Sequence, residues 1–257
     1  MTDSRALRAV FLDIGGTLIE PNPSWEHVYA LALREYGVEI EMDRLFDALR
    51  NAYRHGGWGL ESGFEPSEEA TFARTVEMDR RALAELGVND LPDAFFRRLG
   101  EMFRVTTNWH VYPDVLPALE ALRARGLTIG AVSNWVWSLP ELLHDLDLVR
   151  HFAFVGASAR IGYEKPHRGI FEWALEEAGV EPAQAIHVGD HADADVAGAR
   201  ALGIGAVLIV RGDRPPFPAD ELPDDVPVIR SLEELLPIVD ARLETESHET
   251  QSREAAS

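Results

Sequence analysis

The first apolar segment of the chain is short, uninterrupted and followed by a glycine-rich turn. Residues 9–12 are Ala-Val-Phe-Leu, and Asp13 begins the turn Asp-Ile-Gly-Gly-Thr. An apolar run without polar alternation is typical of a strand that is covered on both faces, as in a parallel sheet. We therefore predict a buried parallel strand that ends directly before Asp13.

A helical pattern of apolar residues follows this turn. Apolar positions recur three and four residues apart, and glycine and proline separate the segments. We see no convincing strand here and expect residues 21–105 to form a helical unit. Its predicted helices cover residues 24–36, 41–54, 67–86 and 92–105.

Strand and helix patterns alternate after residue 106. Such alternation gives a parallel sheet that is covered by helices on both faces. Two of the helices begin at Ser-x-x-Glu sequences that resemble capping boxes, at Ser138 and Ser231. The predicted strands cover residues 127–132, 152–155, 185–188 and 206–210. The other predicted helices cover residues 113–125, 166–178 and 193–202, and the last ends near residue 243.

These patterns together predict an α/β protein with a Rossmann-like parallel sheet, flanked by helices and carrying an inserted α-helical domain. The core domain would comprise residues 1–20 and 106–243, and the inserted domain residues 21–105. Residues 244–257 are polar and rich in Glu and Ser, which predicts a disordered tail.

Polar residues follow several of the predicted strands. Asp13 follows the first strand and Ser133-Asn134 the second, Lys165 lies in the loop after the third, and Asp190 follows the fourth. Ligands of open α/β sheets bind at the carboxyl ends of the strands. We therefore expect these residues, which are distant in the sequence, to meet at one edge of the sheet.

Lys165 is the only lysine among the 24 basic residues, since all the others are arginine. Lysine carries a compact charge with three rotatable donors, whereas arginine presents a planar fork. A chain that otherwise uses arginine, yet keeps one lysine at this edge of the sheet, indicates a site that needs the compact charge.

Composition and charge narrow the classes of partner. The 257 residues carry a formal net charge of −20, which repels nucleic acid and anionic lipid, and an anionic substrate would need a bound cation. The absence of cysteine excludes disulfides and thiolate catalysis. No apolar run has membrane-spanning length, and the polar N-terminus lacks a signal-peptide pattern. We therefore expect a cytoplasmic protein that binds neither nucleic acid nor membrane.

Four motifs resemble, in their order, those of the haloacid dehalogenase-like (HAD) hydrolase superfamily, in its subfamily with a helical cap. The family's first motif, Asp-x-Asp-Gly-Thr, corresponds to residues 13–17, and its second to Ser133. The third is Lys165, and the fourth is Gly189-Asp190 with the further acid Asp195. The helical unit lies where the family inserts its cap. The resemblance implies a hydrolase, and most members are phosphatases.

The resemblance also implies a nucleophile and a metal site. Asp13 would attack phosphorus and form an aspartyl-phosphate. A Mg²⁺ ion would be shared by Asp13, Asp190 and the backbone carbonyl of Gly15. Asp195 would be a further ligand, through water, or a partner of Lys165.

The remaining motif residues would hold a small phosphorylated substrate. Lys165 would neutralise charge between the nucleophile and the phosphoryl group. Ser133, with Asn134 and nearby backbone N–H groups, would bind phosphoryl oxygens. Gly16 would let the backbone approach closely.

One position departs from the family's pattern. Most family phosphatases carry a second Asp two residues after the nucleophile, which protonates the leaving group and then activates water; here that residue is Gly15. General acid–base assistance is worth about 10²–10⁴ in rate. Glu20, His27 and His191 are candidates for a replacement.

The missing acid leaves the reaction open. A metal-dependent phosphatase is the first hypothesis, and a weakly active or inactive module that binds Mg²⁺ and phosphate is the second. A 2-haloacid dehalogenase is a lesser alternative: those enzymes also lack the second Asp and carry Ser-Asn at the second motif, but they have a bulky residue at the position of Gly15 and work without metal. Schiff-base phosphonate hydrolysis is excluded because the helical unit has no lysine. Neither the substrate nor the oligomeric state follows from the sequence.

Several tryptophans lie near these motifs in the sequence. Trp135 and Trp137 follow the second motif, and we expect them to line the mouth of the site or to pack against the helical unit. Trp25 and Trp58 would face either the substrate or the interior of that unit. Trp109 would brace the connection that returns to the sheet.

Overall fold

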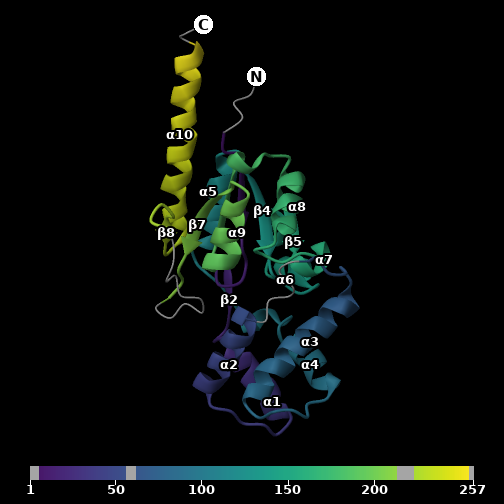
Figure 1. Ribbon diagram of the computed structural model, residues 1–257. Helices are drawn as coiled ribbons and strands as arrows, with labels where there is room; N and C mark the ends of the chain where they lie inside the picture. Colours follow the sequence, from purple (N-terminus) through teal and green to yellow (C-terminus); the bar gives the residue numbers. More distant parts are fainter. Residues whose placement is uncertain (1–5, 56–61, 213–222, 255–257) are drawn as a thin grey trace.

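The computed structural model describes residues 6–55, 62–212 and 223–254. In Figure 1 a sheet domain lies above the helical unit, and the chain passes between them twice. Trp58 and the last residues of the predicted tail, 255–257, lie outside the described residues.

Six parallel strands form the central sheet, in the order β5-β4-β1-β6-β7-β8. The predicted parallel sheet is therefore confirmed, and its first strand has the predicted bounds. The edge strand β8 is not predicted, because two residues are too short to show a pattern. The strands are β1 (Ala9–Leu12), β4 (Thr128–Ser133), β5 (Phe154–Ala157), β6 (Ala185–Gly189), β7 (Gly205–Ile209) and β8 (Val228–Ile229).

Helices cover both faces of this sheet. Val10 and Leu12 of β1 belong to one buried cluster, whereas Ala9 and Phe11 belong to another on the opposite face. Helices α5, α6 and α10 supply side chains to the first cluster, and α8 and α9 to the second. This double cover explains why β1 is apolar at every position. The helices are α5 (Val115–Ala124), α6 (Leu139–Asp145), α7 (Ser158–Ile161), α8 (Arg168–Ala178), α9 (Gly198–Ala201) and α10 (Leu235–Glu254).

The helical unit buries a cluster of its own, in which Leu33, Leu45, Leu83 and Phe95 are almost fully buried. Ser24 and Ser67 cap two of its helices, because their hydroxyl oxygens accept hydrogen bonds from backbone N–H groups of the first turn. All of the predicted helices are present. They are α1 (Trp25–Glu35), α2 (Met42–His55), α3 (Glu68–Glu85) and α4 (Asp93–Met102).

Two short strands join the helical unit to the sheet domain. β2 (Ile19–Pro21) leads into the helical unit, and β3 (Trp109–Val111) leads out of it, directly after the 3₁₀ helix η1 (Thr106–Asn108). The two strands pair in antiparallel fashion. The sequence predicts neither strand, since three residues show no alternation. Their pairing ties the two connections together and holds the helical unit at the carboxyl ends of the strands (Figure 1).

Several helix ends differ from the prediction. Ser138 and Ser231 precede α6 and η5 (Leu232–Glu234), but neither side chain forms a capping hydrogen bond. A capping box forms instead around η3 (Pro182–Gln184), with Glu181 as its first residue. α10 continues to residue 254, into the segment for which the sequence predicts disorder.

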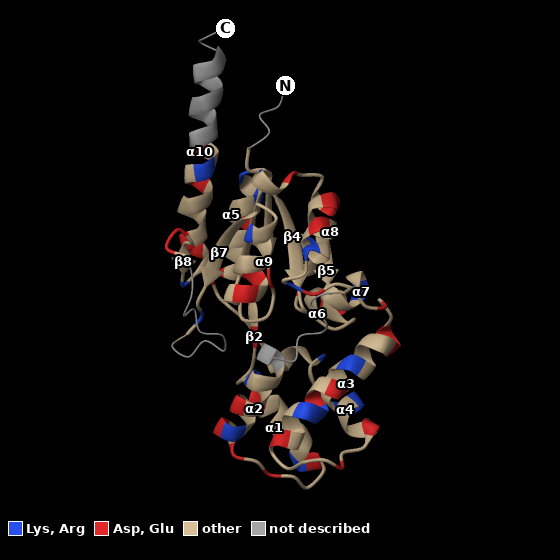
Figure 2. Cartoon of the chain, in the orientation of Figure 1, with Lys and Arg blue, Asp and Glu red and all other residues tan. Residues whose placement is uncertain are grey.

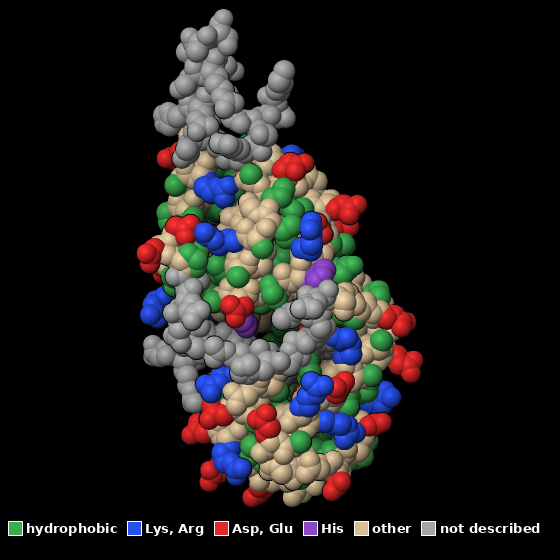
Figure 3. Space-filling model, viewed as in Figure 1, with side chains coloured by type: hydrophobic (Ala, Val, Ile, Leu, Met, Phe, Trp, Pro, Cys, Tyr) green, Lys and Arg blue, Asp and Glu red, His purple; other side chains and the backbone are tan. Residues whose placement is uncertain are grey.

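None of the described helices is both long and apolar enough to cross a membrane. On the face shown in Figures 2 and 3, acidic and basic side chains are interspersed over both the sheet domain and the helical unit. The described residues of this face therefore offer no extended basic surface.

Candidate active site

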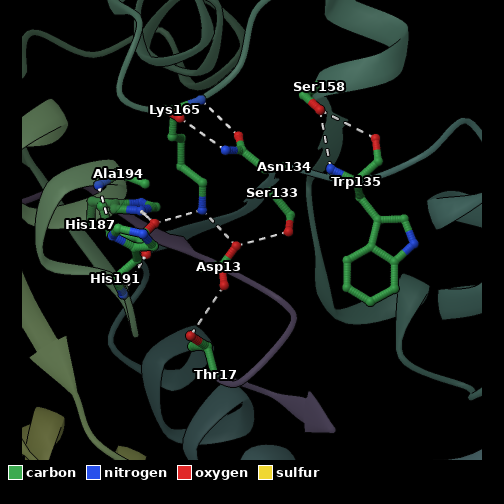
Figure 4. A network of polar contacts seen from close by, with 11 residues as sticks. Asp13, Thr17, Ser133, Asn134, Trp135, Ser158, Lys165, His187, His191 and Ala194 are labelled. Atoms are coloured by element: carbon green, nitrogen blue, oxygen red, sulfur yellow. Dashed lines mark hydrogen bonds and ion pairs between the residues drawn. The ribbon is translucent and has the colours of Figure 1, made fainter. Parts of the chain in front are cut away.

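Asp13 lies directly after β1, in the middle of the sheet, and is buried. Its backbone N–H donates to the carbonyl of Val188 in the neighbouring strand β6 (2.9 Å). Its carboxylate oxygen Oδ1 accepts hydrogen bonds from Ser133 Oγ (2.8 Å) and Lys165 Nζ (2.6 Å), and Oδ2 accepts one from Thr17 Oγ1 at 3.4 Å (Figure 4). The carboxylate is therefore held in one orientation beside a cation.

Lys165 connects two carboxylates. It is 3% exposed, and its Nζ donates to Oδ1 of Asp13 and to Oδ1 of Asp195, both at 2.6 Å. Burial alone would lower the pKa of this ammonium group, but the two negative charges outweigh it and raise the pKa above its usual value. Lys165 is thus a fixed positive charge in the site, where the sequence places it.

Asn134 holds the backbone of Lys165 in place. Its amide Nδ2 donates to the carbonyl of Lys165 (2.9 Å), and its Oδ1 accepts from the backbone N–H of the same residue (2.7 Å). The sequence assigns this amide to substrate binding. Both of its polar atoms thus contact Lys165 and position that residue, while substrate binding by Asn134 stays a prediction.

Asp195 reaches the site from η4 (Ala192–Ala197), a π-helical segment where the sequence predicts an ordinary helix. Its Oδ1 accepts from Lys165 and from His187 Nε2 (2.8 Å), and its Oδ2 accepts from the backbone N–H of His191 (3.0 Å). Burial would raise the pKa of Asp195, but Lys165 and His187 hold it below its usual range. Of the two roles that the sequence leaves open, these contacts favour that of a partner of Lys165.

His187 is a site residue that the sequence patterns do not reveal. It lies in the middle of β6, is fully buried, and packs edge-on against the ring of Phe171. The one available signal is a polar residue within an otherwise apolar strand. Its bond to Asp195 fixes the carboxylate that in turn holds Lys165.

Asp190 completes an acidic cluster. Carboxylate oxygens of Asp13, Asp190 and Asp195 all lie within 4.8 Å of one another. Burial and the charges of Asp13 and Asp195 raise the pKa of Asp190 well above its usual value. Such hard oxygen ligands with unbalanced negative charge suit a Mg²⁺ ion, so the residues present fit the metal that the family resemblance implies.

Gly16 makes this cluster sterically feasible. Its φ of +69° lies in the left-handed region, and a Cβ atom at this position would overlap the carboxylate of Asp190. The predicted need for close approach at Gly16 therefore has a definite neighbour, which is Asp190.

Gly15 lies where the family's second Asp would be. A Cβ atom built on Gly15 would lie 2.9 Å from Cζ3 of Trp135. A side chain at position 15 would therefore require the indole ring of Trp135 to shift.

The three candidates for a replacement acid each have another contact. Glu20 accepts a hydrogen bond from the hydroxyl of Tyr112 (2.7 Å), and the backbone N–H of His27 donates to Ser24 in the cap of α1. His191 uses Nδ1 to accept from the backbone N–H groups of two residues of η4, and burial lowers its pKa. His191 thus caps η4, whereas His27 contributes only a backbone N–H to the cap that Ser24 forms.

Arg211 supports the turn after Asp13. Its Nε and Nη2 donate to the carbonyl of Thr17 (3.1 and 2.8 Å), and its Nη1 donates to Asp114 (2.8 Å). Its guanidinium lies 4.2 Å from the ring centre of Tyr112. The sequence gives no signal for this role, because the partners come from two segments that are far from Arg211 in the sequence.

We expect Arg211→Met to destabilise the protein. The substitution leaves the buried carboxylate of Asp114 without its cation, and such a loss costs about 3–5 kcal/mol. Urea unfolding measures the free energy. Arg168→Met is the matched control, because Arg168 pairs with Glu172 on the surface, where a pair contributes about 0–1 kcal/mol. Equal effects of the two substitutions would contradict the structural role.

Comparison with known proteins identifies the family. A model of the haloacid dehalogenase-like hydrolases matches residues 7–203. The chain is 32% identical over 248 residues to the haloacid dehalogenase-like hydrolase domain-containing protein 3 of Bos taurus, across 91% of this chain and 94% of that protein. It is 40% identical over 234 residues to a glyceraldehyde 3-phosphate phosphatase of Methanopyrus kandleri, across 85% and 91% of the two chains.

A solved structure agrees with these sequence matches. The HAD phosphatase from Thermococcus onnurineus aligns with a TM-score of 0.62 and 26% identity, across 91% of this chain and 98% of that one. The family model covers most of the described sheet domain and all four of its motifs. The chain belongs to the haloacid dehalogenase-like hydrolase family.

Proposed function

We propose that the protein is a Mg²⁺-dependent phosphatase that acts on a small phosphorylated molecule through an aspartyl-phosphate on Asp13. One observation carries the proposal: Lys165 and Ser133 hold one oxygen of Asp13, while Asp190 brings a further carboxylate within 4.8 Å. The phosphatases among the relatives support the same reaction class.

The residues of the chain divide the work as follows. An oxygen of Asp13 attacks phosphorus, and the bond between phosphorus and the leaving-group oxygen breaks. Lys165 balances negative charge on Asp13 and the incoming phosphoryl group. Ser133, whose hydroxyl donates to Asp13 here, can turn to donate to a phosphoryl oxygen. Water then attacks phosphorus and restores the carboxylate.

Asp13, Asp190 and the carbonyl of Gly15 would hold the metal ion. Bound Mg²⁺ would supply positive charge that offsets the repulsion between a carboxylate and a phosphate dianion. Gly15 has no side chain, so no carboxylic acid at position 15 can donate a proton to the leaving group.

Metal removal is expected to abolish turnover. Purified protein treated with a chelator should lose hydrolysis of p-nitrophenyl phosphate and regain it with Mg²⁺. Asp190→Asn should weaken Mg²⁺ binding at least about 100-fold, since it removes a charged ligand rather than an outer-shell contact. Isothermal titration with Mg²⁺ measures the affinity without turnover.

Asp193→Asn is the matched control for this experiment. Asp193 is exposed, lies three residues further along and should bind Mg²⁺ like the parent. Full turnover in the presence of chelator would contradict the metal dependence.

The missing acid favours a second candidate, which is a module that binds Mg²⁺ and phosphate without turnover. Mg²⁺ binding without hydrolysis of p-nitrophenyl phosphate, over several metals, would support it. The dehalogenase alternative is less favoured, because the carboxylate cluster around Asp190 has no use in a metal-free reaction.

A further inference from the structure

Three tryptophans form a continuous aromatic surface between the helical unit and the site. The ring centres of Trp109 and Trp135 are 5.2 Å apart, those of Trp25 and Trp109 are 5.5 Å apart, and those of Trp25 and Trp135 are 6.2 Å apart. Trp109 is buried and anchored by a bond from its Nε1 to the carbonyl of Phe103 (2.8 Å). Trp25 is 39% exposed and Trp135 is half-buried, so neither residue is enclosed by the protein. We call these three residues the aromatic wall.

Trp135 brings the aromatic wall close to Gly15, in the turn that begins at the nucleophile. Trp135 lies two positions after Ser133, which contacts Asp13. Its ring would lie 2.9 Å from a Cβ atom built on Gly15. In Figure 4 the indole lies on the Ser133 side of Asp13, across from Lys165. In this view the ammonium group of Lys165 and the indole of Trp135 therefore lie to either side of Asp13.

The protonation of the leaving group as it departs depends on the groups that lie beside Gly15. A leaving group that meets no acid must leave as an anion. The phenol of tyrosine has a pKa of about 10, whereas an alkyl alcohol is close to water, at about 16. A phenolate is accordingly a far better unprotonated leaving group than an alkoxide.

The missing acid favours a leaving group that is stable as an anion, and the aromatic wall favours an aryl ring. A phenol has both properties. We propose that the protein hydrolyses phosphate monoesters of phenols, with the aryl ring stacked against Trp135 at the aromatic wall. This inference rests on the proposed phosphatase function and specifies its substrate class. Aromatic rings pack favourably in offset-stacked or edge-to-face arrangements with ring centres about 4.5–7 Å apart, a range that includes the ring distances within the wall.

The reaction balances with water as the only co-reactant. An oxygen of Asp13 forms a bond to phosphorus, and the bond from phosphorus to the aryl oxygen breaks. The electron pair leaves with that oxygen, and the phenolate takes a proton from solvent. Water then attacks phosphorus, releases inorganic phosphate, frees the carboxylate of Asp13 and gives its proton to solvent.

A set of three esters separates the two contributions. Phenyl phosphate has an aryl ring and a good leaving group, benzyl phosphate has the ring on an alkyl leaving group, and cyclohexyl phosphate has neither. We expect kcat/KM for phenyl phosphate to exceed that for cyclohexyl phosphate at least about 100-fold, in the range of the missing acid–base assistance. Benzyl phosphate should share the lower kcat but have a KM closer to that of phenyl phosphate.

Trp135→Leu tests the stacking surface. We expect it to raise KM for phenyl and benzyl phosphate by about 3- to 10-fold, the value of one aromatic contact, and to leave KM for cyclohexyl phosphate unchanged. Trp135→Phe should retain most of the binding. Trp137→Leu is the matched control in the same loop, since the ring of Trp137 packs against Arg160 instead.

Position 15 offers an independent test. Gly15→Asp alone should gain little activity, because the ring of Trp135 would have to shift to make space for its side chain. Combined with Trp135→Ala, it should raise kcat for cyclohexyl phosphate by about 10²-fold. A gain of this size from Gly15→Asp with Trp135 unchanged would overturn the assignment of this space to the indole.

The outcomes distinguish this inference from the function on which it rests. Equal kcat/KM values for phenyl and cyclohexyl phosphate, measured on the unmodified protein, overturn the aryl preference and leave the phosphatase intact. An equal rise in KM for all three esters in Trp135→Leu overturns the role of the aromatic wall. No hydrolysis of any ester, p-nitrophenyl phosphate included, with Mg²⁺ overturns both.

Discussion

Asp13→Asn is expected to abolish turnover, with a loss of about 10⁴-fold or more, as for removal of other covalent nucleophiles. An amide cannot form the acyl-phosphate, yet it has almost the same volume as the carboxylate and can still accept from Ser133 and Lys165. The fold should therefore persist. Steady-state kinetics with p-nitrophenyl phosphate gives the loss, and thermal unfolding without metal shows whether the variant is folded.

The same variant separates nucleophilic from purely electrostatic roles of Asp13. Removing one of three clustered carboxylates should not lower the metal-free melting temperature, because it relieves repulsion and leaves Lys165 paired with Asp195. A folded Asp13→Asn protein that keeps a tenth or so of the parent kcat would contradict covalent catalysis, since typical nucleophile deletions cost many orders more.

Lys165→Met is expected to damage both activity and stability. The substitution leaves Asp13 and Asp195 buried without their shared cation, which should lower the free energy of unfolding by about 3–5 kcal/mol. We also expect kcat to fall by about 10³-fold, because charge on the phosphoryl group is no longer balanced. Urea unfolding in the absence of metal and steady-state kinetics measure the two effects.

Two further variants separate the charge of Lys165 from its compact shape. Lys165→Arg keeps the charge but not the compact shape, so it should not restore activity in a site where Lys165 is 3% exposed. Asp195→Asn in the Lys165→Met background should recover part of the lost stability, because one uncompensated carboxylate is gone. An unfolding free energy of Lys165→Met equal to that of the parent would contradict the buried ion pairs.

Local patterns in the sequence predict much of this fold. The run Ala9–Leu12 is a strand because every position is covered, and the helices of the helical unit follow from spacing alone. Asp13, Ser133, Lys165 and Asp190 meet because they end strands, or follow strands, that are neighbours in one parallel sheet. Ligands of such sheets bind at the carboxyl ends of the strands, so short motifs after each predicted strand are enough to locate these residues.

The features that the sequence does not predict depend on partners from distant segments. His187 and Arg211 gain their roles only through Asp195 and through Thr17 and Asp114, respectively. The short pair of β2 and β3 shows no pattern within either strand. The bonds of Asn134 to the backbone of Lys165 are likewise not predicted, because a motif does not say which way an amide points.

Position 15 shows most clearly what a structure adds. From the sequence, Gly15 is simply the absence of an acid. In the folded chain a Cβ atom at this position would lie 2.9 Å from the ring of Trp135. That ring packs against Trp109 and Trp25. The missing carboxylate at position 15 and the aromatic ring beside it are therefore parts of the same local structure.

Direct trapping of the phosphoryl group tests the covalent role of Asp13. Protein mixed with p-nitrophenyl phosphate and Mg²⁺ is quenched with borohydride, which reduces an acyl-phosphate to an alcohol, and its peptides are sequenced by mass spectrometry. We expect the side chain of Asp13 to be converted to that of homoserine, only when substrate and metal are both present. An unreduced Asp13 in protein that is turning over, or reduction at another carboxylate, would contradict an aspartyl-phosphate at this residue.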